Sequence, residues 1–444
     1  MDAREVALLT LNACERQGGW SDGVLKKQIA AAGLDSRDAG LATQLCFGVI
    51  QNRILLDFYL SKFSNIPLRR LEGKVLQALR LGLYQMLFLT RIPHSAAVDQ
   101  SVALTRAHCK NPRAPGMVNA ILRNLERSLD RLPTIPEDDP AEYYATLYSH
   151  PVWLVRELLE TLGSEGTAAF LQADNSQPPI TAMVNTVKTD LEGALEALQA
   201  EGVHGEPHPW LKNCLVLSRS GSLEELDAFR NGLFYVQDPA SRLAVMALDP
   251  EPGSRVLDMC AAPGGKSFAA AIQMKDQGEI WSCDLHPHKK TLIQKGAQRL
   301  GLTCIRPQTA DGKVRRPEWE GTFDRVLVDA PCSGLGVIRK KPDIRFKDPE
   351  PLAGLPQVQS AILDNAAGYV KPGGVLVYST CTVLERENEG VTDAFLAAHP
   401  EFSREGFLLP GPAGEVLGGQ ITLWPQVHGT DGFYICKLRK DGEA

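Results

Sequence analysis

Hydrophobic and polar positions fall into two different patterns along the chain. Residues 1–131 place apolar side chains three and four positions apart, as in LATQLCFGVIQNRILLDFYLSKF and VLQALRLGLYQMLFL, with no strand-like alternation. This spacing predicts an all-helical domain. The Pro-rich, acidic segment RLPTIPEDDP (131–140) follows, and its composition is typical of a linker.

From residue 253 onward, short apolar runs alternate with helical stretches. The expected strands are SRVLDMCA, GEIWSCDL, TCIRPQTA, FDRVLVDAP and GGVLVYSTC. Near-continuous apolar strands separated by helices predict an α/β fold with a mostly parallel, doubly wound, Rossmann-like sheet. The tail ITLWPQVHGTDGFYICKLRK predicts a hairpin that closes over residues 429–432 and forms an antiparallel edge.

The stretch between these regions mixes both patterns. HPVWLVRELLETLG predicts a helix ended by Gly163, ITAMVNTV and CLVLSRS predict strands, and DLEGALEALQAEG predicts a helix between them. We therefore expect a small α+β module. The predicted domains are residues 1–135, 141–250 and 251–444.

Charge is distributed unevenly over the 444 residues. Residues 1–131 carry 18 Lys and Arg against 11 Asp and Glu, a net charge of +7, whereas the whole chain has −6. A basic first domain on an acidic remainder is typical of a nucleic-acid partner, although a solvated helical surface would also explain it.

Targeting signals and metal motifs are not found in the sequence. The start lacks the pattern of a signal peptide, and no run of about 18 apolar residues could span a membrane. The ten cysteines include no C-x-x-C, which disfavours a zinc site and favours free thiols in a reducing cytosol. We expect a cytoplasmic protein, monomeric, with no metal and no membrane partner.

A Gly-rich turn, DMCAAPGGKS (258–267), joins the first strand of the sheet to its helix. It matches neither G-x-G-x-x-G nor G-x-x-x-x-G-K-[ST], which disfavours dinucleotides and nucleoside triphosphates. Asp284, Asp311 and Asp329 are expected at the ends of the next three strands, where parallel sheets bind ligands. A loop cap would explain any one of them, but together they favour S-adenosylmethionine, a nucleoside cofactor without a pyrophosphate. The expected cofactor-binding residues are Cys260, Ala261, Ala262, Pro263, Gly264, Gly265, Lys266, Asp284, Asp311 and Asp329.

Two cysteines follow neighbouring strands, Cys332 in DAPCSG and Cys381 in YSTCT. A buried apolar role is the common fate of one cysteine, but two at one sheet edge favour chemistry. Position alone points to Cys332 as a nucleophile, although spacing cannot rank the pair. The basic loop RKKPDIRFK then favours a phosphate backbone, against the alternative of a solvated surface loop. The expected RNA-binding residues are Arg339, Lys340, Lys341 and Arg345.

DMCAAPGGK, VDAPCSG and YSTCT, in this order, resemble the RNA (cytosine-5) methyltransferase family, as does FYVQDPASRLA (234–244). LRLGLYQML, PHSAAVDQSV and MVNAILRN resemble the helical RNA-binding domain of the antitermination factor NusB. Together they are similar to the bacterial branch that methylates small-subunit (16S) ribosomal RNA, over nearly the whole chain. Met183 and Phe346 depart from the usual Arg and Trp of the family, outside the catalytic set but at positions that bear on RNA contacts.

The resemblance implies a mechanism and a substrate. It assigns the nucleophile to Cys381, which would add to carbon 6 of cytosine, and gives Cys332 a role in resolving the adduct. Asp329 is placed to stabilise charge at ring nitrogen 3, and Lys266 to orient Asp329 or the cofactor. The substrate would be 16S rRNA, either naked or in a partly assembled small subunit.

Other functions stay open on the sequence alone. A sister enzyme could methylate tRNA or another rRNA cytosine, and an RNA-binding factor could carry a degenerate methyltransferase domain. The intact Gly-rich turn, the aspartates and both cysteines disfavour the second alternative. The lack of G-x-G-x-x-G disfavours a nicotinamide-dependent dehydrogenase.

Overall fold

The computed structural model describes residues 1–17, 21–218 and 221–442. The chain divides into two compact units. The helical unit contains residues 1–175 together with the short segment 341–347, and the α/β unit contains residues 176–340 and 348–444. Within the described ranges, no helix is both long and apolar enough to cross a membrane.

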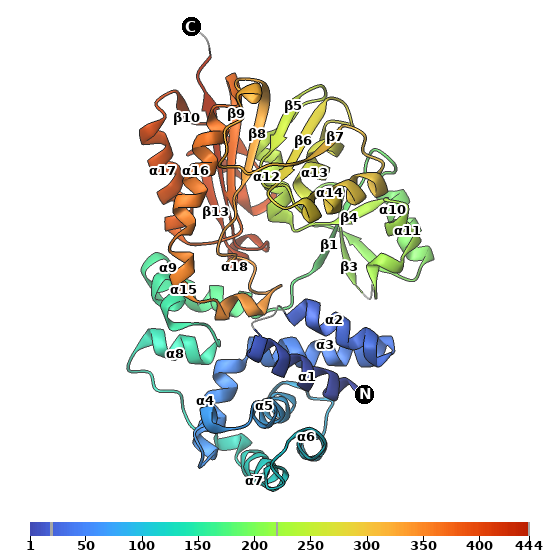
Figure 1. Ribbon diagram of the computed structural model, residues 1–444, viewed down its shortest axis with the longest axis vertical. Helices are drawn as coiled ribbons and strands as arrows, with labels where there is room; N and C mark the ends of the chain where they lie inside the picture. The colour runs from blue at the N-terminus through green and yellow to red at the C-terminus, as the bar shows by residue number, and fades with distance from the viewer. Residues whose placement is uncertain (18–20, 219–220, 443–444) are drawn as a thin grey trace. The chain divides into compact units, whose positions relative to one another are not determined.

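The helical unit confirms the predicted all-α architecture (Figure 1). Its elements are α1 (Ala3–Gln17), α2 (Ser21–Ala32), α3 (Ser36–Gln51), α4 (Arg53–Phe63), η1 (Leu68–Arg70), α5 (Gly73–Phe88), α6 (His94–His108), α7 (Ala114–Glu126), η2 (Leu129–Arg131), α8 (Pro140–Leu147), α9 (Val152–Asp174) and, from the inserted segment, η5 (Pro342–Phe346).

Helix α5 forms the centre of this unit because it is buried on all sides from Val75 to Met86. A Cβ on Gly48 would lie 2.0 Å from the ring of Tyr84, so this glycine lets α3 and α5 approach closely. Arg80 lies within the same buried stretch, and Asp57 and Glu15 neutralise it at 2.7 and 3.2 Å. Buried charges require such partners, so these ion pairs fix the position of α5.

The segment 341–347 completes the helical unit although it is distant in sequence. Arg345 is 1% exposed, and its guanidinium donates to the carbonyls of Gln51 and Ser149 at 2.6 and 2.9 Å. A third bond, of 3.0 Å, reaches the side-chain oxygen of Asn175. Beside it, Phe346 packs on the helical core, with the guanidinium of Arg53 3.3 Å from its ring centroid. The segment is therefore part of the core of this unit.

The α/β unit begins with a small module around a four-stranded antiparallel sheet of order β2-β3-β1-β4. The module confirms the predicted α+β pattern, and the strands β2 and β4 add to the two predicted ones. Residues 219–220, the end of the predicted strand CLVLSRS, lie outside the described residues. The elements are β1 (Ile180–Val184), α10 (Leu191–Ala200), β2 (His204–Pro207), β3 (Cys214–Ser218), η3 (Leu223–Glu225), α11 (Asp227–Arg230) and β4 (Phe234–Val236).

The larger sheet has the order β10-β14-β9-β8-β5-β6-β7, with β13 also paired to β14 (Figure 1). Strands β5 to β9 are parallel, which confirms the doubly wound fold. Its elements are α12 (Pro239–Leu248), β5 (Arg255–Asp258), α13 (Gly265–Gln273), β6 (Glu279–Asp284), α14 (Pro287–Leu300), β7 (Ile305–Thr309), η4 (Pro317–Trp319), β8 (Phe323–Asp329), α15 (Pro349–Leu352), α16 (Leu355–Ala367), β9 (Val370–Thr380), η6 (Glu385–Glu387), α17 (Glu389–Ala398), β10 (Phe402–Arg404), β11 (Phe407–Leu408), η7 (Gly411–Ala413), β12 (Glu415–Val416), β13 (Gln420–Leu423), α18 (Pro425–His428) and β14 (Phe433–Lys440).

Successive residues of the central strands enter opposite cores, because side chains alternate along a strand. Leu327 and Val377 pack against α12, α13 and α14 on one face. Val326 and Leu376 pack against α16 and α17 on the other. The two-sided burial explains why these strands read as continuous apolar runs.

Three local expectations differ from the structure. The helix predicted to end at Gly163 continues to Asp174, and Gly163 (φ 65°) marks a kink inside it. Helices α8 and α9 group with the N-terminal helices, whereas the sequence pattern assigned residues 141–175 to the middle module. The C-terminal hairpin forms as β13 and β14, but β14 is internal, because β9 pairs with one side of it and β10 and β13 with the other.

The contacts of Arg345 generate a stability prediction. Arg345→Ala should lower the free energy of unfolding of the helical unit by about 3 kcal/mol, because two carbonyls and an amide oxygen lose a buried charged donor. Thermal unfolding and hydrogen exchange in α3 and α4 of the full chain would measure this loss. Lys341→Ala, at an exposed position in the same segment, is the control and should leave both unchanged. Unchanged stability with weakened RNA binding in the Arg345 variant would contradict the structural role.

Candidate functional site

The site lies where the order of the parallel strands reverses, between β5 and β8, as expected for a doubly wound sheet. The Gly-rich turn connects β5 to α13 there. Gly264 has φ 115°, and a Cβ on it would lie 2.4 Å from the ring of Phe268. Only glycine fits this position, so the ring of Phe268 packs directly against the turn at the start of α13.

A cavity of about 380 Å³ opens at the carboxyl ends of the strands. The predicted residues Cys260, Ala262, Asp284, Asp311 and Asp329 line it, together with both Cys332 and Cys381. The structure therefore brings the expected carboxylates and thiols to one cavity. Ala261, Pro263, Gly264, Gly265 and Lys266 build the turn without being among its lining residues.

The cavity combines polar and apolar groups in a way that suits a nucleoside. Asp284 ends β6 and accepts a hydrogen bond of 3.1 Å from the backbone N–H of His286. Asp311 lies two residues beyond the end of β7 and accepts from the N–H of Lys313 at 3.0 Å. Leu285, 52% exposed, adds an apolar surface at the same wall. Carboxylates can accept hydrogen bonds from ribose hydroxyls and base amino groups, and an apolar wall can pack against a base. The lining therefore fits a nucleoside.

Asp258, the first residue of the turn motif, was missed as a site residue in the sequence. Burial raises its pKa to about 7, and it accepts a hydrogen bond of 2.7 Å from Ser267. Ser282 of β6 donates to the same Ser267 hydroxyl at 2.7 Å. This chain of three side chains fixes β5, α13 and β6 to one another beneath the cavity. Asp258 ends a strand directly before a Gly-rich turn, and this position is the signal in the sequence that could have identified it as a site residue.

Asp329 forms an ion pair with Lys266, with 2.7 Å between Oδ2 and Nζ. Its other oxygen accepts a hydrogen bond of 2.9 Å from Ser379. Burial disfavours the charge of Lys266, but the Asp329 carboxylate outweighs this and raises the pKa of Lys266. Ser241 and the ring of Phe433 also contact the ammonium group, at 3.3 and 5.1 Å. Lys266 thus contacts Asp329, one of the two partners that the sequence analysis considered for it.

Cys332 and Cys381 meet at the same edge, with 3.2 Å between their sulfur atoms. The next residues reinforce this pairing, since Ser333 donates to the hydroxyl of Thr382 at 2.7 Å. The hydrogen bond with Cys381, together with burial, raises the pKa of Cys332 well above its ordinary value. Cys332 therefore keeps its proton at neutral pH.

Glu387 is a second residue that the sequence did not reveal. It is buried, and its carboxylate accepts hydrogen bonds of 2.9 Å from the backbone N–H of Ser333 and from Gln359. Ser333 directly follows Cys332, so Glu387 supports the loop that carries this thiol. The acidic stretch ERENEG after YSTCT is a weak signal, because exposed acidic turns have the same composition.

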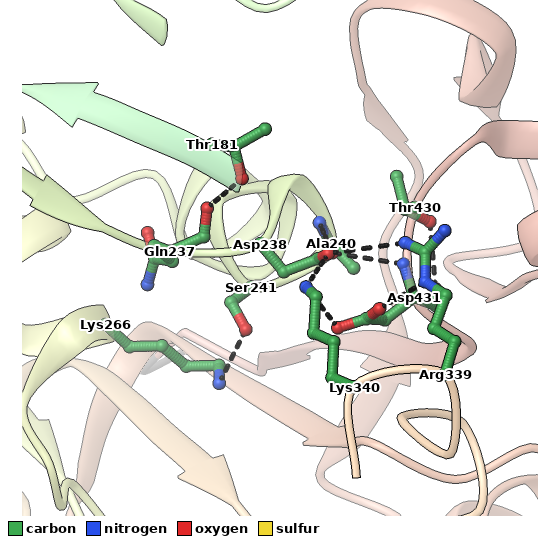
Figure 2. A network of polar contacts seen from close by, with 10 residues as sticks. All are labelled: Thr181, Gln237, Asp238, Ala240, Ser241, Lys266, Arg339, Lys340, Thr430 and Asp431. Carbon is green, nitrogen blue, oxygen red and sulfur yellow. Dashed lines mark hydrogen bonds and ion pairs between the residues drawn. The ribbon is translucent and has the colours of Figure 1, made fainter. Parts of the chain in front are cut away.

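Three of the four predicted RNA-binding residues form ion pairs or hydrogen bonds with other protein groups. Arg339 and Lys340 contact Asp238 and Asp431 within the α/β unit, as Figure 2 shows. Arg345 is buried in the helical unit, where its partners are backbone carbonyls and Asn175. Lys341 alone of the four is exposed. The expected phosphate-binding loop is therefore mostly anchored to protein, because burying its cations requires nearby acceptors. The two residues that differ from the usual family pattern also contact other protein groups. Met183 lies in the core of the α/β unit, and Phe346 packs against the core of the helical unit.

Known proteins match the chain over its full length. The family 16S rRNA methyltransferase RsmB/F matches residues 245–439, the NusB family residues 1–127, and an RsmF/B-like ferredoxin-like domain residues 150–224. A relative from Bacillus subtilis, described as a probable ribosomal RNA small subunit methyltransferase B, is 40% identical and covers 99% of each chain.

Solved structures agree with these matches. The crystal structure of the protein PH0851 is 26% identical, covers 99% of each chain and has a TM-score of 0.81. A methyltransferase homolog from Pyrococcus horikoshii is 28% identical, with a TM-score of 0.56, and covers 67% of this chain and 97% of its own. The methyl donor of this family is S-adenosylmethionine, and carboxylates and apolar groups line the cavity.

The cavity generates a binding prediction. Asp284→Asn should weaken S-adenosylmethionine binding about tenfold, because an amide loses the charge that strengthens hydrogen bonds from ribose hydroxyls. Isothermal titration calorimetry would measure the affinity. Glu279→Gln, at the opposite end of β6, is the matched control and should bind normally. Equal affinity of both variants would show that Asp284 does not hold the cofactor.

Proposed function

Because the chain belongs to the RsmB/F family of small-subunit ribosomal RNA methyltransferases, we propose that it methylates carbon 5 of a cytosine in 16S rRNA. The reaction proceeds through a covalent bond between Cys381 and carbon 6 of that cytosine. Two thiols and an ion-paired carboxylate at the edge of the cofactor cavity support this chemistry. The target base must leave its stack to reach them.

The cofactor is held by Asp284, Asp311 and the Gly-rich turn. When bound there, it supplies an electrophilic methyl group on a sulfonium centre. The residues of the chain must therefore make carbon 5 of cytosine nucleophilic, hold the ring and remove the proton that the methyl group replaces.

The 3.2 Å contact between the two thiols is the observation that carries the proposal. Cys332 has a raised pKa and keeps its proton, so it can donate a hydrogen bond to the sulfur of Cys381. A donor at this distance stabilises a thiolate on Cys381, and the thiolate is the nucleophile. The contact is symmetric, and Cys381 is taken as the attacking residue because the family resemblance assigns it that role.

Attack by Cys381 forms a sulfur–carbon 6 bond and pushes the electrons of the 5,6 double bond toward ring nitrogen 3. The proton that Cys381 gives up when it becomes a thiolate is taken up by Asp329, which passes it to nitrogen 3 and so neutralises this charge. Lys266, 2.7 Å away, and Ser379, at 2.9 Å, fix the orientation of Asp329. Such fixed polar groups stabilise developing charge without reorganisation.

Release requires the loss of the carbon 5 proton and of the thiol. Once Cys381 is bound to carbon, it no longer carries the charge that holds the proton on Cys332. Cys332 can then pass its proton to the Asp329 carboxylate and accept the carbon 5 proton, while the electrons of the C–H bond restore the double bond and expel Cys381 as a thiolate. The proton on nitrogen 3 leaves to water. Cys332 is thus the group that ends the covalent stage.

The two cysteine roles predict opposite results on denaturing gels. Cys332→Ala should accumulate a covalent protein–RNA adduct in the presence of S-adenosylmethionine, because attack proceeds and release fails. Cys381→Ala should give neither adduct nor methylated RNA. Cys109→Ala, at a half-buried cysteine of the helical unit, is the control and should turn over normally. An adduct that forms only in the Cys381 variant would reverse the assignment.

We further propose that the helical unit binds the RNA, because it carries the NusB-family match and the basic first 131 residues. Bisulfite sequencing of small-subunit RNA from cells with and without this protein tests the substrate. We expect one cytosine to resist bisulfite conversion in cells with the protein and to be converted when the protein is absent. Protection lost from tRNA or from another rRNA would instead identify a sister activity, and unchanged protection everywhere would refute the assignment.

A further inference from the structure

Asp238, Arg339, Lys340 and Asp431 form a cluster of charged side chains in the α/β unit (Figure 2), and none of the four lines the cavity. The carboxylate of Asp431 forms ion pairs with Nε of Arg339 and Nζ of Lys340, with a nitrogen–oxygen distance of 2.8 Å in each. Asp238 also contacts Lys340, and the guanidinium of Arg339 lies 3.6 Å from it. The side chains of Arg339 and Asp431 are each 5% exposed. Two cations and two anions therefore balance one another inside the protein.

The cluster joins three segments that each reach the proposed active site. Asp238 caps α12 by accepting from the N–H of Ala240 at 2.9 Å, and Ser241 in the same turn contacts Lys266. Asp431 precedes Gly432 and Phe433, and the ring of Phe433 also faces Lys266. The third segment is the loop from Cys332 to Lys340.

That loop is tied to Cys381 through the backbone. The N–H of Gly336 donates to the carbonyl of Cys381 at 2.9 Å, and the N–H of Gly432 donates to the carbonyl of Gly336 at 2.8 Å. A Cβ on Gly336 would lie 1.8 Å from the carbonyl oxygen of Gly432. The two backbones are therefore in direct contact, and the ion pairs of Arg339 and Lys340 with Asp431 lie next to this contact.

We propose that Asp238, Asp431, Arg339 and Lys340 form an electrostatic clamp that positions Cys332 against Cys381. This inference rests on the proposed roles of the two cysteines. None of the four residues lines the cavity, so they are positioning residues and act through the loop. The clamp also explains why two basic side chains of the loop are directed into the protein.

The geometry of the thiols can be measured without RNA or cofactor. Diamide oxidises two thiols to a disulfide and takes up their two electrons and two protons, so its rate reports how the sulfurs meet. Peptide mapping by mass spectrometry would follow the Cys332–Cys381 disulfide in the full chain. We expect Asp238→Asn and Lys340→Met each to slow it about tenfold, because small displacements have large effects on such reactions.

The variants separate a positioning role from a general loss of stability. Asn caps helices as well as Asp does, so Asp238→Asn removes the charge and keeps the start of α12. Asp190→Asn, the same change at the exposed N-cap of α10 in the same unit, is the matched control. Lys340→Arg keeps a cation and should restore the disulfide rate that Lys340→Met loses.

Turnover gives the second measurement. Clamp variants should lower kcat for RNA methylation about tenfold or more and leave the RNA KM unchanged. A raised KM with an unchanged disulfide rate would mean that Lys340 contacts RNA, and an unchanged disulfide rate in both clamp variants would overturn the clamp. If Cys332→Ala forms no adduct while the clamp variants still slow the disulfide, the proposed cysteine roles fail and the clamp stands.

Discussion

The parallel pairing of β8 with β9 is the constraint on which the site depends. Asp329 lies opposite Ser379 in this register, and the two side chains are hydrogen-bonded. The chain continues from both strands in the same direction, so the cysteines that follow come within 3.2 Å of each other. A slip of one residue would turn every side chain of β8 to the opposite face of the sheet, exchanging the two cores and separating the reacting groups at once.

Charge neutralisation inside the protein is the second constraint. Lys266 is held by Asp329, Arg80 by Asp57 and Glu15, and Arg339 and Lys340 by Asp238 and Asp431. In each case a cation that would be costly to bury alone fixes two or three segments of the chain relative to one another. Basic residues of a loop therefore have two possible uses, to bind a phosphate backbone or to anchor the loop. Local composition is the same for both.

This ambiguity shows what the sequence could and could not predict. The strands, the Gly-rich turn and the two cysteines were predictable, because periodicity and the spacing of residues within a motif depend on neighbouring residues. The location of Arg345 was not, since its acceptors at Gln51 and Ser149 are nearly 300 and 200 positions away. Glu387 and Asp238 were missed for the same reason, because their partners come from other segments. The kink at Gly163 was read as a helix end because glycine is typical of both.

The loop after β8 serves two units in succession. Residues up to Lys340 belong to the α/β unit, and the next seven belong to the core of the helical unit. Because Arg339 and Lys340 are the last residues of the loop that belong to the α/β unit, their ion pairs hold its end within that unit. The proposed clamp thus fixes both ends of the stretch from Cys332 to Lys340, since the other end contacts Cys381 at 3.2 Å.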